Sequence, residues 1–125
     1  MLLLSLLIAC AEDTAINYST EACQNWDLDS EDPPLLSAES TGDGLLVTRN
    51  GLREDCSATF RPDVQLDRKV IRVFEAWDGA GDGTCNLCVM AVLDIGPLPG
   101  RSYEIQWYTE DNDVVPVDTI VADIR

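Results

Sequence analysis

The 125-residue sequence contains no histidine. The side chain best suited to acid–base chemistry near neutral pH, which is also the commonest metal ligand, is therefore missing. This absence excludes Ser–His and Cys–His nucleophile pairs. Chemistry based on carboxylates alone stays open, so the sequence favours a non-catalytic protein without a cofactor but does not forbid an enzyme.

Cations are scarce, with 8 Lys and Arg residues against 23 Asp and Glu residues and a formal net charge of −15. Nucleic-acid binding depends on cationic neutralisation of phosphates, so no nucleic-acid partner is expected. Anionic lipid headgroups are repelled for the same reason. Any attachment to a membrane must therefore be covalent or occur by insertion.

An apolar run long enough to cross a membrane is also missing, and the N-terminal residues 1–9 are apolar except for Ser5. Nine residues cannot cross a bilayer as a helix, which takes about 20, but they match the apolar core of a secretory signal, about 7–15 residues long. No positive charge precedes this core, so we expect the true translation start to lie upstream. The alternative is that residues 2–9 form a buried strand or helix and that Cys10 is a core thiol.

Leu7, Ile8, Ala9 and Cys10 resemble the lipobox of bacterial lipoprotein signal peptides. The resemblance implies cleavage before Cys10 and attachment of a diacylglyceryl group to its thiol. Two or three acyl chains anchor a protein stably to a membrane, whereas a single chain binds reversibly. In an envelope with two membranes, Ala11 in place of Asp resembles the signal for sorting to the outer membrane.

Three regions follow from this reading. Residues 1–9 form the signal peptide, residues 10–22 the lipidated Cys10 with a flexible tether, and residues 23–125 the folded domain. The composition turns polar after Cys10, as expected for a tether that leaves a membrane surface.

If Cys10 carries a lipid, four of the five cysteines remain, an even number suited to disulfides. They are Cys23, Cys56, Cys85 and Cys88. Exported proteins fold in oxidising compartments, where such cysteines pair. Three pairings are possible; we favour Cys23 and Cys56 each bonded to one of Cys85 and Cys88, because two long loops restrict the unfolded chain most. The alternatives are a zinc site made of all four cysteines and a redox dithiol at the C-x-x-C sequence 85–88.

From residue 45 onward the apolar pattern has a period of two, which is typical of β-strands. The expected strands span residues 45–48, 57–66, 69–77, 87–95, 102–109 and 114–121. Asn50-Gly51 predicts a hairpin turn. The nearly continuous apolar run 87–95 predicts a central strand, and Pro116 indicates an edge strand. The sequence therefore predicts a small, antiparallel, all-β sandwich stapled by disulfides.

The segment Leu98-Pro99-Gly100-Arg101-Ser102-Tyr103-Glu104-Ile105 resembles the corner that leads into a late strand of immunoglobulin-like and fibronectin type III sandwiches. The resemblance covers eight residues and concerns architecture alone. It implies that Pro99 and Gly100 turn the chain and that the Tyr103 hydroxyl bonds back to the backbone of the corner.

Two further features are candidates for ligand binding. The loop 78–83 resembles the start of a calcium loop, but Ala80 stands at a ligand position and Val89 cannot supply the closing carboxylate. A calcium site could instead use acidic side chains from other segments: Asp27, Asp29, Asp111 or Asp113. The competing interpretation of these residues is a solvated acidic surface.

The aromatic side chains Trp26, Trp77, Trp107 and Tyr108 could form a carbohydrate platform. Trp77 is expected to be the most exposed, because it precedes a glycine-rich loop. Trp107 shares a face with apolar residues and is expected in the core, with Tyr108 on the opposite face. The simpler interpretation is that these rings pack the sandwich.

Together these features predict an exported lipoprotein, anchored to a bacterial membrane through Cys10, whose non-catalytic β-sandwich is an envelope component or interaction module with an unknown protein partner. A calcium- or carbohydrate-binding module that uses the acidic loops and Trp77 is the first alternative. A zinc or dithiol protein is the second.

Overall fold

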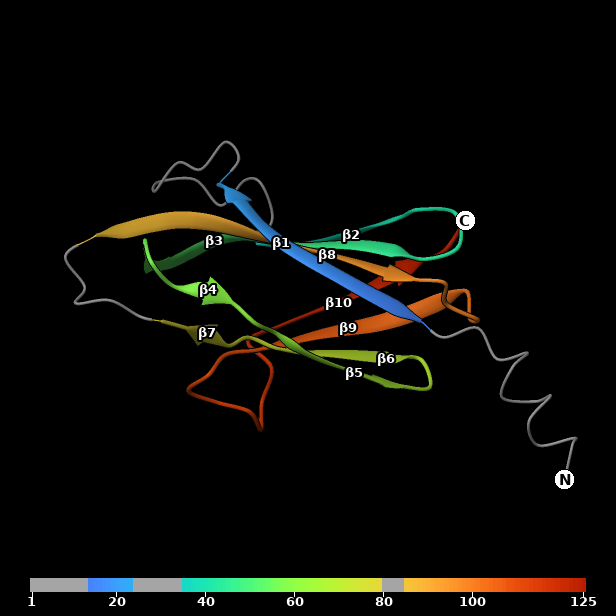
Figure 1. Cartoon of the computed structure of the whole chain (residues 1–125). Helices are drawn as coiled ribbons and strands as arrows, with labels where there is room; N and C mark the ends of the chain where they lie inside the picture. The colour runs from blue at the N-terminus through green and yellow to red at the C-terminus, as the bar shows by residue number, and fades with distance from the viewer. Residues whose placement is uncertain (1–13, 24–34, 80–84) are drawn as a thin grey trace, which may run out of the picture.

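A computed structural model describes residues 14–23, 35–79 and 85–125, and all regular structure in these ranges is β (Figure 1). The strands are β1 (Ala15–Ala22), β2 (Leu36–Ser40), β3 (Leu45–Asp55), β4 (Thr59–Phe60), β5 (Asp63–Asp67), β6 (Val70–Phe74), β7 (Trp77–Asp78), β8 (Asn86–Gly96), β9 (Ser102–Tyr108) and β10 (Asp118–Asp123). The predicted all-β class is confirmed.

Two four-stranded sheets and one short ribbon make up the sandwich. The first sheet has the order β1-β8-β3-β2, the second has the order β10-β9-β6-β5, and β4 pairs with β7. Strand β8 lies inside the first sheet, as its continuous apolar run predicts. The pair β6 and β9 is parallel, unlike the other strand pairs of the described ranges. The chain passes through β7 and β8 between these two strands, and such a crossover returns it in the same direction.

The core forms where the inward faces of the two sheets meet. Alternate residues of β3, β6, β8 and β9 point inward because side chains alternate across a strand. The buried apolar cluster comprises Leu36, Leu45, Val47, Leu52, Phe60, Ile71, Val73, Ala91, Leu93, Ile95, Leu98, Tyr103, Ile105, Trp107 and Ala122. Trp107 is completely buried and Tyr108 faces the opposite side of β9, so both positions match the alternation in the sequence.

Residues 15–22, which the sequence assigns to the flexible tether, instead form strand β1, so that assignment is wrong for these residues. Strand β1 pairs with β8 from Ala15 opposite Gly96 to Ala22 opposite Val89. Thr14 also belongs to the fold, because its hydroxyl donates to the Pro97 carbonyl at 2.8 Å. Seven of the eight side chains of β1 are exposed, so backbone pairing rather than apolar burial holds this strand.

The hairpin predicted at Asn50-Gly51 is also wrong, because β3 continues through both residues. The register with β8 shifts between Arg49 and Leu52, and Gly51 has a φ of 76°. A glycine in this left-handed conformation is typical of a β-bulge as well as of a tight turn. The last strand likewise begins at Asp118 rather than at 114, after Pro116.

Tyr103 lies over Gly100 at the corner before β9. Its hydroxyl accepts the Gly100 backbone N–H at 2.6 Å, the contact that the immunoglobulin-like resemblance implies. A Cβ atom at position 100 would lie 2.8 Å from this hydroxyl and 3.1 Å from the ring. The close approach therefore requires glycine after Pro99.

Candidate functional site

Acidic side chains gather at one end of the sandwich, which we call the acidic end. In Figure 1 it lies away from the start of β1 and from the C-terminus, beside β4, β7 and the β9–β10 loop. Its carboxylates belong to the end of β3, the segment between β6 and β7, strand β7 and the β9–β10 loop. In chain order they are Glu54, Asp55, Glu75, Asp78, Glu110, Asp111 and Asp113.

The carboxylate of Glu75 joins two tryptophans at this end. Its Oε1 accepts the indole N–H of Trp107 and its Oε2 accepts that of Trp77, each at 2.9 Å. The Glu75 backbone N–H donates to the Tyr108 carbonyl at 2.9 Å, which fixes the carboxylate beside β9. The Trp77 backbone N–H in turn donates to Glu110 at 2.6 Å. Glu75 and Glu110 therefore act as structural acceptors.

Trp77 packs against the fold and is half-buried, which counts against its use as an open carbohydrate platform. Its ring centroid lies 5.1 Å from that of Phe60, its partner across the β4–β7 ribbon. Phe60 also stacks with Trp107 at 6.2 Å and meets the edge of Tyr18 at 5.9 Å. Among the candidate platform aromatics that the structure describes, Trp77 is more exposed than Trp107 and Tyr108, as expected, but it is half-buried rather than open; the more exposed ring is that of Tyr18, at 45%.

Arg49 follows Leu45 and Val47 on the inward face of β3, so its side chain enters the space between the sheets. Burial lowers the pKa of its guanidinium, and the nearby charges of Asp118 and Glu75 oppose that shift. The buried Nε and Nη1 atoms have no hydrogen-bond partner within the described ranges. An arginine guanidinium is not deprotonated in proteins, so that of Arg49 stays charged despite its burial. The negative charges of Glu75 and Asp118 compensate this positive charge at a distance.

The pKa of Glu54 reflects the repulsion between neighbouring carboxylates at the acidic end. Partial burial raises the pKa of its carboxyl, and the negative charges of Glu75, Glu110 and Asp55 raise it further. Ionised Glu54 is therefore less favourable in the folded chain than in the unfolded chain. Its ionisation costs stability at neutral pH, and this cost disappears as the pH falls through the raised pKa.

We therefore expect Glu54→Gln to raise the Tm at pH 7 by about 1–2 °C, the size typical of a partly exposed charge. The difference from the parent should shrink as the pH falls and vanish below the ordinary value of 4.5. Thermal unfolding between pH 4 and pH 8 measures this. Glu39→Gln, at an exposed position of β2, is the control and should leave the Tm within error. A lower Tm for Glu54→Gln at pH 7 would contradict the assignment.

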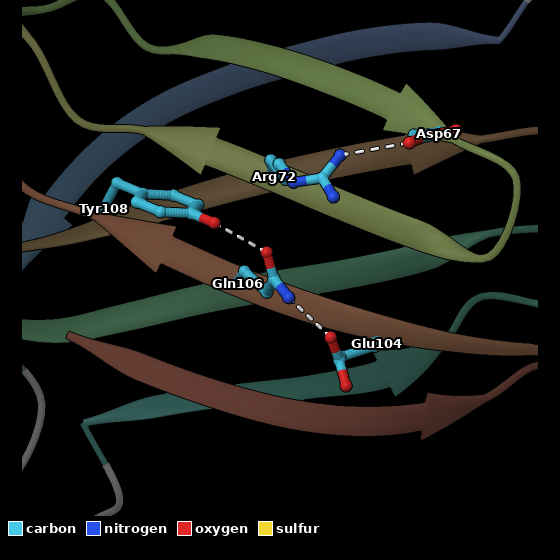
Figure 2. Close-up of polar contacts among 5 residues, drawn as sticks. All are labelled: Asp67, Arg72, Glu104, Gln106 and Tyr108. Atoms are coloured by element: carbon cyan, nitrogen blue, oxygen red, sulfur yellow. Dashed lines mark hydrogen bonds and ion pairs between the residues drawn. The ribbon is translucent and has the colours of Figure 1, made fainter. Parts of the chain in front are cut away.

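The outer face of the second sheet carries a row of polar contacts (Figure 2). The Tyr108 hydroxyl donates to Gln106 at 2.7 Å, and the Gln106 amide donates to Glu104 at 2.6 Å. Arg72, which lies beside Gln106 on β6, pairs with Asp67 at 3.3 Å. The Tyr108 ring stacks on Phe74, with centroids 4.6 Å apart. These groups satisfy one another along the sheet, which is typical of a solvated face.

The disulfides are Cys23–Cys88 and Cys56–Cys85, each with Cα atoms 5.5 Å apart. This is one of the pairings that the sequence favours, with Cys85 and Cys88 bonded to different partners. Cys23 follows β1 and Cys56 follows β3, so the two bonds tie β8 to both of its neighbours at the acidic end. Because all four of these cysteines are in disulfides, a zinc site or a redox dithiol could form only after the chain is reduced.

Several predicted site residues lie outside the described ranges: Cys10, Trp26, Asp27, Asp29 and the loop 80–83. Asp78 pairs with Arg61 at 2.8 Å, and Asp111 and Asp113 are exposed. Across residues 14–23, 35–79 and 85–125, no group of three or more His, Cys, Asp or Glu side chains could hold a metal ion. The same ranges contain no helix long and apolar enough to cross a membrane.

Sequence reasoning missed the Glu75 carboxylate, the enclosed Arg49 and the exposed valines of the β9–β10 loop. Val114, Val115 and Val117 were assigned to a strand, but they precede β10 and are largely exposed. Asn112 and Pro116 are turn-forming residues in this segment and could have indicated a loop.

Comparison of the chain with protein-family models, with curated proteins and with solved structures finds no match. The function must therefore be argued from the residues of this chain.

Proposed function

We propose that this chain is an exported, lipid-anchored lipoprotein whose β-sandwich acts as a non-catalytic interaction module of a bacterial envelope. The anchor is the thiol of Cys10 in the lipobox-like sequence 7–10. Two disulfides are consistent with an exported, non-cytoplasmic protein. The missing histidine and the self-satisfied polar face of the second sheet support a role in binding rather than catalysis.

The observation that carries the proposal is the early start of the fold. Thr14 already bonds to Pro97, and β1 begins at Ala15. Three residues lie between Cys10 and Thr14, which makes four steps along the chain, and a chain reaches at most about 3.3–3.6 Å per step. A lipid on Cys10 would therefore hold the start of β1 within about 15 Å of the bilayer surface, with the acidic end directed away from it.

The distribution of charge supports this orientation. Four of the eight cations lie around the end where β1 starts: Arg68, Lys69, Arg101 and Arg125. Asp43, Asp67 and Asp123 lie at the same end and offset part of this positive charge, so this end is less negative than the opposite one. An anionic membrane would repel the acidic end more strongly, which favours the same orientation as the anchor.

Cys10→Ser tests the proposal. The parent, expressed with its leader in a bacterial host, should enter the detergent phase when membranes are extracted with Triton X-114, because two or three acyl chains anchor stably. The Cys10→Ser chain should move to the aqueous phase, and Ala11→Ser, which keeps the cysteine, should behave as the parent. A parent chain in the aqueous phase, or Cys10→Ser in the detergent phase, would contradict the proposal.

A further inference from the structure

We propose that the β9–β10 loop, residues 109–117, is a docking surface for a partner protein with an apolar pocket ringed by Lys and Arg. The inference rests on the proposed function, because it names the class of partner that the anchored module binds. Three observations carry it: exposed valines at the tip, a fixed loop conformation and an acidic rim.

Three apolar side chains are exposed within four consecutive positions of the loop, with Pro116 between the last two. Val114 is 80% exposed, Val115 58% and Val117 50%. Single exposed apolar residues are ordinary, but a contiguous exposed apolar patch marks an interaction surface. The valines therefore form a small apolar knob, which a shallow apolar pocket would cover.

The knob is held in place by its own loop. The Asn112 side-chain oxygen accepts the backbone N–H groups of Val114 at 3.0 Å and Val115 at 3.1 Å. The Val117 N–H donates to the carbonyl of the buried Trp107 at 2.8 Å. Glu110 holds the other side of the loop through the Trp77 N–H. A loop already fixed in one conformation loses less entropy on binding, so it suits recognition.

The rim of the knob carries negative charge. Glu110, Asp111 and Asp113 precede the valines, and all three are exposed. Such a rim repels an anionic bilayer, and it repels a second copy of a chain with a net charge of −15. It complements a cationic surface, and charge complementarity speeds association and selects the partner. The occupant is therefore a basic protein surface rather than lipid or a second copy.

The position of the loop agrees with this assignment. In Figure 1 it projects from the end of the sandwich opposite the start of β1. An anchor at Cys10 would leave this end pointing away from the membrane, where another envelope protein can reach it.

The test places p-benzoylphenylalanine at Val114 of the full-length chain in the organism that encodes it, followed by irradiation and peptide mass spectrometry of the adducts. The control carries the same probe at Leu66, an exposed apolar residue of β5. We expect position 114 to give one protein adduct whose cross-linked peptide is flanked by Lys and Arg, and position 66 to give none of it. Asp111→Asn with Asp113→Asn should lower the yield at least about threefold, whereas Asp111→Glu with Asp113→Glu should preserve it.

The inference is wrong if position 114 gives no adduct, or gives adducts only with lipid or with a second copy of the chain. It is also wrong if position 66 gives the same adduct, or if the Asp111→Asn and Asp113→Asn variant gives an unchanged yield. Detergent partition of the same probe-bearing chain reports the anchor separately. An aqueous chain that still gives the basic adduct contradicts the anchor alone. A detergent-phase chain without the adduct contradicts the docking surface alone.

Discussion

Replacing Cys23 and Cys88 together by alanine is expected to lower the free energy of unfolding by about 3–4 kcal/mol, the value for a long closed loop. The bond joins residues 65 apart in sequence, so its loss frees a large part of the unfolded chain. It also releases the end of β1, a strand that buries little apolar surface. A loss of this size corresponds to a fall in Tm of about 10–20 °C.

Urea denaturation followed by tryptophan fluorescence measures this change, with Cys10→Ser as the control because Cys10 belongs to neither disulfide. The control should unfold at the same urea concentration as the parent. The Cys56–Cys85 loop lies inside the larger loop, so each bond shortens the loop that the other closes, and removal of both bonds should cost more than the sum of the separate losses. Unchanged stability of the Cys23→Ala and Cys88→Ala double variant would show that the bond does not hold the native fold.

Glu75→Ala is expected to lower the free energy of unfolding by about 2–3 kcal/mol, since an unpaired buried donor costs about 1–3 kcal/mol. The indole N–H of the fully buried Trp107 would lose its acceptor without access to water. Trp77 is half-buried and would recover part of its loss by solvation. Arg49 would also lose one of the two charges that compensate it.

Equilibrium unfolding of Glu75→Ala, of Glu75→Gln and of the exposed control Glu39→Ala measures this effect. Glu75→Gln keeps one acceptor oxygen, so its loss should lie between those of the other two variants. The near-ultraviolet circular dichroism of both Glu75 variants should change, because the carboxylate orients two indoles. Equal stability of Glu75→Ala and Glu39→Ala would contradict the structural role of this carboxylate.

The parts of the fold that the sequence predicted are those in which side-chain burial follows strand alternation. Tyr103, Ile105 and Trp107 alternate with polar residues, and all three are buried as predicted. The apolar run in β8 correctly indicated an inner strand. The favoured class of disulfide pairing also matches the structure, because two long loops distinguish this class from the pairing of Cys85 with Cys88. Loop length does not choose between the two pairings of the class.

The parts that escaped prediction depend on contacts between distant segments. Strand β1 is held by backbone bonds to β8, and its exposed side chains leave no apolar signal. Asn50-Gly51 has the local chemistry of a turn, but its place beside β8 makes it a bulge. The hydrogen bonds that Glu75 accepts come from tryptophans 2 and 32 positions away in the sequence, and no spacing in the sequence marks such a site.

Intact and peptide mass spectrometry of the mature chain, before and after reduction, tests the central claim most directly. The chain would be expressed with its native leader and purified from bacterial membranes. We predict an N-terminus at Cys10 that carries the added mass of acyl chains, and cross-linked peptides that join Cys23 to Cys88 and Cys56 to Cys85. A chain that retains Met1, has no lipid and has free thiols at Cys85 and Cys88 would contradict both the anchor and the disulfide-stapled fold.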